Sequence, residues 1–262
     1  MIPTRGKNKK DGRLRSVRMF VIGNKILYRR RLGCHWRMLP YDLTRKGSVY
    51  DYFARWHGDG TMQKTNETGV WTIRQIEAVS KEIDPSAASI GRKTVKPSER
   101  SGSRRYDGVK KITRRERRIS VDMVDLLLAV LVSIGSTYDA YGARPVVKQL
   151  SQSRQPRLSI TYANSKHHNR ALRDAICRQK NLTWELEAIR RPIGVKHFAL
   201  LPSRWVAEQT FSRPARPRRP SRYHEHRIES SDAMVHDASI KHTPRRLVPS
   251  GDQLQFKYRL LA

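Results

Sequence analysis

The sequence predicts an α/β protein in which a mixed β-sheet is flanked by helices and preceded by a small helical region. Two observations lead to this prediction. Residues 17–80 carry apolar side chains at helical spacing, whereas from Arg118 onward apolar segments of strand length alternate with helical ones. The resulting order of strand, hairpin, helix, strand, helix, strand and helix is typical of a layered α/β fold.

The N-terminal part begins with a basic arm, residues 1–16, and continues as the helical region 17–80. A helix is expected over 17–32, ending before Gly33, and Pro40 then stops regular structure. A clean helical stripe follows at i, i+3, i+4 and i+7 and ends at a glycine-rich turn, and a further apolar set predicts another helix. The stripe consists of Val49, Tyr52, Phe53 and Trp56, the turn is Gly58-Asp59-Gly60, and the further set is Trp71, Ile73, Ile76 and Val79.

The remaining elements follow from a change of period. Alternation over 118–123 and a continuous apolar run over 126–133 predict two strands, joined by a hairpin turn at Val124-Asp125. The second strand is expected to be buried on both faces. A helix is expected over 143–150, starting at Pro145. Strands are then predicted over 158–163 and 184–189, and helices over 171–179 and 204–211.

The composition is strongly basic. The 262 residues include 54 Lys and Arg against 23 Asp and Glu, a formal net charge of +31 (54 − 23). Hydrophobic residues are 37% of the chain, so a core must be built from a few dense segments. Such a charge opposes compaction, and a polyanionic partner would relieve it. Nucleic acid is therefore the first partner to consider, and a collagen or a disulfide scaffold is disfavoured.

Cysteine use and hydropathy indicate the compartment. Cys34 and Cys177 stand far apart and form no C-x-x-C pair, which is typical of a reducing cytoplasm and gives no zinc motif. The longest apolar stretch, 126–134, has nine residues, and a membrane-spanning helix needs about 20. The basic start leads into no apolar run long enough for a signal peptide. We therefore expect a cytoplasmic protein with no membrane partner.

The densest charge outside the C-terminal third lies in 92–118. This segment has twelve basic and three acidic residues, +9 over 27 positions, with Gly102, Tyr106 and Gly108 among the charges. A solvated face is the alternative, but this density favours phosphate contact. The candidate DNA-binding residues are Arg92, Lys93, Lys96, Arg104, Arg105, Lys110, Lys111, Arg114, Arg115 and, further along, Arg204.

Six motifs follow one another in order: GCHWRMLP, VYDYFARWHGDGT, RYDGVKK, RISVDMVDLLLAVLV, LPSRWVAEQTF and ESSDAM. Together they resemble the small bacterial insertion-sequence transposases of the IS5 type, in the IS4/IS5 superfamily of DDE enzymes, over residues 15–247. The resemblance implies a DNA-binding role for the helical region 17–80. It also implies an RNase H-like core over 84–247, followed by a tail over 248–262.

The same resemblance implies an activity. In that family three carboxylates hold two Mg²⁺ ions for DNA cleavage and strand transfer. Two metals about 3.5–4 Å apart clamp the attacking and leaving oxygens, and hard Mg²⁺ takes oxygen ligands. The implied partners are terminal inverted repeats and target DNA. The implied setting is the bacterial nucleoid, and a homodimer is the assembly to test.

The three family carboxylates carry over unevenly. The Glu falls on Glu208, with Arg204 one turn earlier, so Glu208 is the one expected metal ligand. The second Asp position is Asn164 and the first is Gly91. Asn164 can offer a neutral carbonyl oxygen, whereas Gly91 offers no side-chain ligand. We therefore expect little or no strand transfer, with Mg²⁺ binding weakened.

Alternatives stay open beside this interpretation. Glu208 and Arg204 are also spaced as an ordinary i, i+4 surface pair. Asp107 or Asp122 could stand in for the missing Asp, although strand register disfavours it. Prolines at family helix positions, together with Arg213, suggest a decaying gene copy. Those prolines are Pro214, Pro217, Pro220 and Pro244.

Three functional hypotheses follow. The chain is a DDE transposase by descent with impaired catalysis, a non-catalytic DNA-binding protein, or a relic polypeptide that is largely unfolded.

Overall fold

The computed structural model describes twelve stretches of the chain. They are residues 18–40, 46–77, 82–99, 101–103, 105–107, 111–134, 139–152, 155–164, 184–189, 194, 201–215 and 221–247. The predicted helix over 171–179 lies outside them.

The N-terminal helices form where the apolar spacing predicts them. They are α1 (Met19–Leu32), the short 3₁₀ helix η1 (Trp36–Met38), α2 (Lys46–Gly58) and α3 (Thr61–Glu77). The first ends at Gly33, whose φ of 76° is the left-handed conformation that glycine adopts most readily. The third begins at Thr61, ten residues before Trp71, the first member of the apolar set that predicted it, and Asp59 accepts the Thr61 N–H at 2.9 Å at this end.

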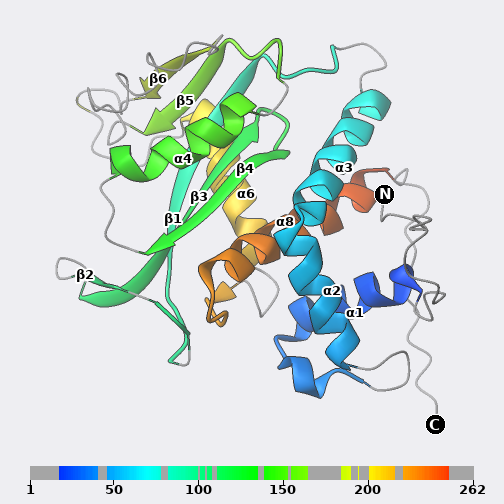
Figure 1. The fold of residues 1–262 in the computed structure, drawn as a ribbon. Helices are drawn as coiled ribbons and strands as arrows, with labels where there is room; N and C mark the ends of the chain where they lie inside the picture. The colour runs from blue at the N-terminus through cyan, green and yellow to red at the C-terminus, as the bar shows by residue number, and fades with distance from the viewer. Residues whose placement is uncertain are drawn as a thin grey trace.

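The sheet is mixed. Its strands are β1 (Ala87–Val95), β2 (Arg105–Asp107), β3 (Ile112–Asp122), β4 (Leu127–Ile134), β5 (Ile160–Asn164) and β6 (Glu185–Ile189). The main sheet runs β4-β3-β1-β5-β6; β1 and β4 are antiparallel to β3, and β5 is parallel to both β1 and β6. An antiparallel meander followed by two parallel strands is the RNase H-like order, so the predicted fold class is confirmed (Figure 1).

The strand predictions hold except where buried charges hide the period. The hairpin turn is confirmed, with Asp125 at a φ of 68°. β3, however, starts six residues before Arg118, because a run of buried charged residues precedes the alternating apolar ones. β1 has no apolar alternation of its own, so the periodicity did not predict it.

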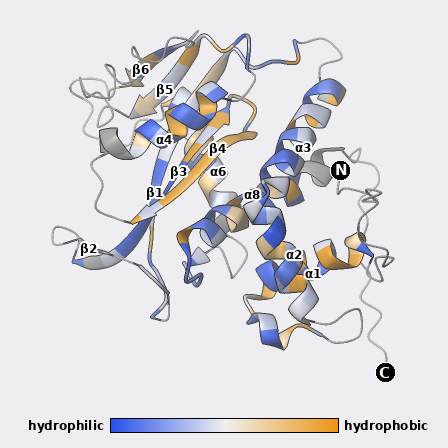
Figure 2. Cartoon of the chain, in the orientation of Figure 1, coloured by the Kyte–Doolittle hydropathy of each residue, from blue (hydrophilic) through white to orange (hydrophobic). Residues whose placement is uncertain are grey.

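Helices cover both faces of the sheet. α4 (Asp139–Gln152) lies in front of it and α6 (Pro202–Ala215) behind it in Figure 1. α4 contributes Val147 and Leu150 to a cluster with Ile90, whereas α6 contributes Ala207 and Phe211 to a cluster with Ile119. Figure 2 shows the apolar residues concentrated along β4, which pairs with β3.

Pro145, Pro214 and Pro244 lie inside helices. Pro145 does not start α4, as predicted, but lies in its interior. It is exposed, so water can hydrogen-bond the carbonyl that a proline leaves without a partner. α6 extends past Arg213 and Pro214 to Ala215, and the long C-terminal helix α8 (Ile228–Leu247) contains Pro244. Pro217 and Pro220 fall outside the described residues.

α8 joins the N-terminal helices to the sheet. Its Met234 packs in a cluster with Ile22 and Phe53, while its Val235 packs with Ile119 in the sheet. α8 also forms a buried ion pair, Arg30 Nε to Asp237 Oδ2 at 2.8 Å. None of the helices in the described part of the chain combines the length and apolarity of a membrane-spanning segment.

The outer edge of β4 is capped by side chains. Asp232 on α8 accepts the Val132 N–H at 2.5 Å, and Asn66 on α3 donates to the Leu127 carbonyl at 3.0 Å. Burial raises the pKa of Asp232 to about 8, assisted by the charge of Glu229. The folded chain therefore holds a proton on Asp232 that the unfolded chain releases near the ordinary Asp pKa.

This proton makes stability depend on pH. The contribution of a raised carboxyl pKa is fully present below the unfolded pKa and is lost as pH rises toward about 8. Between pH 6.5 and 8.5 we expect the free energy of unfolding to fall by about 1–2 kcal/mol through Asp232. Urea unfolding of the protein and of Asp232→Asn at both pH values measures it. Equal pH slopes in the two proteins would contradict the assignment.

Candidate functional site

The two strand positions that carry the family Asp residues lie side by side. β1 and β5 pair in parallel with Ala87 opposite Ile160, Ala88 opposite Thr161 and Ser89 opposite Tyr162, a constant offset of 73. Carried on, the same offset leads from Gly91 to Asn164 (91 + 73 = 164). The backbone therefore brings the two positions to one level of the sheet, as the resemblance implies.

The third position comes from α6, which packs directly on Gly91. A Cβ atom at position 91 would lie 2.8 Å from both Ala207 Cβ and Phe211 Cε2. Glu208 follows Ala207 on this helix and is exposed. No ion pair joins Glu208 to Arg204, although both residues are described. The structure thus places α6, the helix that carries Glu208, against position 91. We call the three positions that the resemblance implies, 91, 164 and 208, the carboxylate site.

The residues present do not fit a pair of Mg²⁺ ions. Position 91 has no side chain, and Ala207 with Phe211 fills the space where a carboxylate would stand. Within the described residues, no group of three or more His, Cys, Asp or Glu could hold a metal ion. Glu208 alone brings one formal charge to a site that must offset four.

Asp122 does not replace the missing Asp. It pairs with Ala88 rather than Gly91, whose partner on β3 is Ile119. Its Oδ2 accepts from Arg74 at 2.7 Å, and its Oδ1 accepts the backbone N–H of Leu126 at 2.8 Å. Burial raises the pKa of Asp122, and the Arg74 charge opposes this rise. Asp122 therefore holds the β3–β4 turn, while the side chain of Asp107 lies outside the described part.

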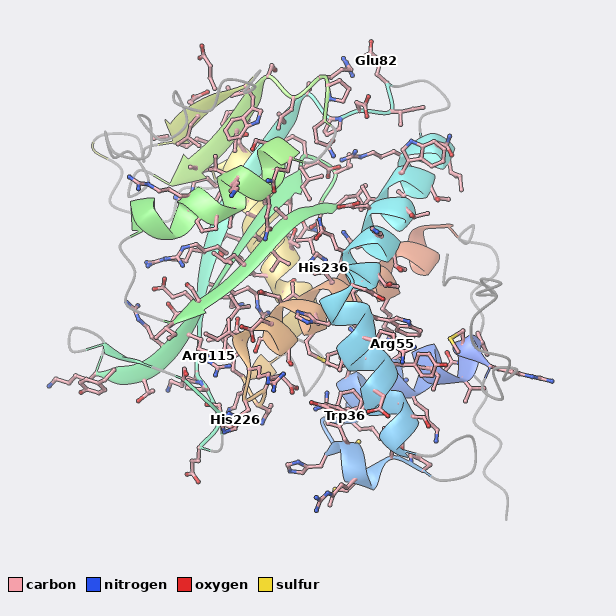
Figure 3. The ribbon with its side chains drawn as sticks, in the orientation of Figure 1. Trp36, Arg55, Glu82, Arg115, His226 and His236 are labelled. Carbon is pink, nitrogen blue, oxygen red and sulfur yellow. The ribbon has the colours of Figure 1, made fainter. Side chains whose placement is uncertain are left out.

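Three of the candidate DNA-binding arginines are used inside the protein. Arg92 and Arg114 pair with the fully buried Glu116, at 3.0 and 3.4 Å. Arg115 is also fully buried. It donates to the carbonyls of Ser103 at 2.8 Å, Glu225 at 2.9 Å and His226 at 3.1 Å, and Figure 3 shows it beside His226. Arg115 therefore joins the start of β3 to the chain before α8 and offers no surface charge.

Four other candidates keep their charge available. Lys96 and Lys111 are exposed, and Lys93 and Arg204 are half-buried. Within the described residues none of the four forms an ion pair. Lys93 lies two residues after Gly91 on β1, and therefore on the same face of the sheet. The side chains of Arg104, Arg105 and Lys110 lie outside the described part.

Sequence reasoning did not identify two structural features of this region. The first is Glu116, which is buried and pairs with three arginines. In the sequence it is only one acidic residue within a basic segment. Tyr106 was only a neighbour of charges, but its side chain is 61% exposed on β2. Its place two residues beyond Arg104 in a short alternating segment was the available signal.

Comparison with known proteins adds a family match. Residues 1–66 match the family model described as "Putative transposase of IS4/5 family (DUF4096)". This match confirms, for the helical N-terminal part, the resemblance that the motifs indicated. Comparison with curated proteins gives no match.

Three solved structures are similar in outline. The catalytic domain of Mos1 mariner transposase is 14% identical, with 71% of this chain and 89% of that chain covered and a TM-score of 0.36. The Mos1 mariner paired-end complex with Mn is 12% identical, with 92% of this chain and 80% of that chain covered and a TM-score of 0.34. A pre-cleavage Mos1 transpososome is 13% identical, with 90% of this chain and 79% of that chain covered and a TM-score of 0.32.

Proposed function

We propose that the chain is a DDE-type transposase of the IS4/5 group by descent that binds DNA but neither cuts nor joins it. The observation that carries this proposal is the packing of Ala207 and Phe211 against Gly91. This packing occupies the place of a catalytic carboxylate in the family and leaves no metal pocket there.

The basic surface supports DNA binding. A net charge of +31 is offset better by a polyanion than by a small anionic ligand, which carries few charges. Lys93 lies on β1 two residues after Gly91, and Arg204 lies on α6 one turn before Glu208. Lys96 directly follows β1 and Lys111 directly precedes β3, and both are exposed. Ammonium and guanidinium groups without internal partners bind phosphate oxygens and release counterions, which favours a polyanion over a single phosphate.

The charge and the ligand set of the site argue against metal-dependent catalysis. Two-metal phosphodiester transfer needs ligands that bridge both cations and balance their charge. Here Glu208 is the one carboxylate of the set, and Lys93 on the same sheet face repels cations. Each 1.36 kcal/mol of lost transition-state stabilisation lowers the rate about tenfold. We therefore expect the ancestral cleavage and strand transfer to be lost while phosphate binding persists without metal.

We predict DNA binding that depends steeply on salt and not at all on metal. If about four phosphates are contacted, affinity for a duplex should fall about 100-fold between 50 and 200 mM salt. Fluorescence anisotropy with a labelled duplex, in Mg²⁺ and in EDTA, measures both dependences. A flat salt response, or binding that disappears in EDTA, contradicts the proposal.

Substitutions that remove single positive charges locate the DNA-binding surface. The triple variant Lys93→Gln, Lys96→Gln and Lys111→Gln should reduce the slope of log affinity against log salt by about 3. Lys148→Gln is the matched control, because Lys148 is exposed on α4, which covers the opposite face of the sheet. Magnesium-dependent cleavage of a terminal-repeat duplex that Glu208→Ala abolishes would show that the site is still catalytic.

A further inference from the structure

We propose that Tyr106 stacks on a nucleobase, so that the β2–β3 ribbon holds a single or unpaired DNA strand. This inference rests on the proposed DNA binding and adds a specific contact to it. The ribbon, the exposure of the ring, the face on which it lies and the charge around it each support the assignment.

The ribbon extends beyond the main sheet. β2 pairs only with the first residues of β3, as Arg105 with Arg114, Tyr106 with Thr113 and Asp107 with Ile112. The neighbours β1 and β4 pair with β3 from Arg115 onward. The segment 105–107 with 112–114 is therefore a two-stranded arm, and Figure 1 shows β2 projecting from the edge of the core.

The ring of Tyr106 is available on this arm. The residue is 61% exposed, and in the part of the chain that the structure describes its side chain forms no hydrogen bond and no ring contact. An exposed aromatic face on a basic arm can stack on any base, because every base has a π face. One stacked base strengthens binding by about tenfold.

Tyr106 faces the same side of the sheet as the carboxylate site. Directly opposed residues of an antiparallel pair share a face, and every second residue returns to it. Tyr106 opposes Thr113, and six residues further along β3 (119 − 113 = 6) Ile119 opposes Gly91. At about 3.3 Å per residue this places Tyr106 about 20 Å from position 91, or about six nucleotide steps along one strand.

The charge near Tyr106 selects nucleic acid over a protein partner. Between residues 104 and 111 the chain carries Arg104, Arg105, Lys110 and Lys111 against Asp107 alone. Docking of a protein would need a contiguous apolar patch, but Tyr106 stands among charged neighbours. Its opposed residue, Thr113, is small and polar.

Binding to a base-free strand tests the contact. The probes are a 12-nucleotide oligothymidylate and an abasic strand of equal length, which has the same phosphates and no bases. The unmodified protein should bind the thymidylate about tenfold more tightly than the abasic strand. Tyr106→Ala should lose this preference, whereas Tyr106→Phe, which keeps an aromatic face, should retain it. A cooperative thermal melt of each variant establishes that it is folded.

The outcomes separate this proposal from the proposed function. If the unmodified protein binds neither strand, the proposed DNA binding fails. If it binds both equally, or if Tyr106→Ala weakens both equally, DNA binding stands but stacking is overturned. Loss in Tyr106→Phe as well as in Tyr106→Ala would also overturn stacking, because the hydroxyl and not the ring would then make the contact.

Discussion

Replacing Glu116 with Gln is expected to lower the free energy of unfolding by about 3–5 kcal/mol. Glu116 is fully buried and forms three ion pairs. Its Oε1 atom lies 3.0 Å from Arg92 and 3.4 Å from Arg114, and its Oε2 atom lies 2.5 Å from Arg118. Gln keeps the shape but removes the charge. Arg118, which is also fully buried, then loses the charge that compensates it, and an uncompensated buried charge is among the costliest defects in a core.

Urea unfolding measures this loss. Glu187→Gln is the matched control, because Glu187 is exposed on β6, and a substitution there should change stability by no more than about 0.5 kcal/mol. A cost below about 1 kcal/mol for Glu116→Gln would mean that the arginine cluster is solvated rather than buried.

Introducing an acid at position 91 is expected to damage the fold rather than create catalysis. A Cβ there meets Ala207 Cβ and Phe211 Cε2 at 2.8 Å. Because Ala207 Cβ is attached directly to the helix backbone, α6 must shift. Gly91→Ala should therefore cost about 1–3 kcal/mol by overpacking. Gly91→Asp should cost at least about 1 kcal/mol more, since it also buries a carboxylate without a partner.

A second glycine serves as the control. A Cβ at Gly47 meets no atom within 4 Å. Gly47 lies in α2, so Gly47→Ala should stabilise the chain by about 0.5–1 kcal/mol. The double variant Gly91→Asp and Asn164→Asp should still show no Mg²⁺-dependent cleavage. A gain of cleavage in that variant would contradict the closed carboxylate site.

The prediction of the fold from sequence succeeded where segments are amphipathic. The helices around Phe53 and Ile22 and the hairpin at Val124-Asp125 form as their spacing predicts, because burial of one face is a local property of the sequence. It failed at the start of β3, where Arg115, Glu116 and Arg118 are buried. A charged residue is buried only when a partner compensates it, and that partner is not visible in the local pattern.

The candidate site divides in the same way. Positions 91, 164 and 208 are implied by the resemblance, but where they lie depends on the β1–β5 register and on the packing of α6. Among the basic candidates, Lys93 and Lys111 remain available whereas Arg115 is fully buried. Sequence cannot separate them, since all three belong to one basic run.

The sequence by itself determined the charge of the protein, the helical character of its N-terminal part and the presence of Gly91 and Asn164 where the resemblance implies Asp, because each is a property of single residues or of local spacing. Only the tertiary structure decided that Phe211 closes the space beside Gly91, that Glu116 holds three arginines, and that Tyr106 stands exposed on the β2–β3 arm. These outcomes depend on which distant segments pack together, and packing and charge compensation are set by contacts between residues far apart in the chain.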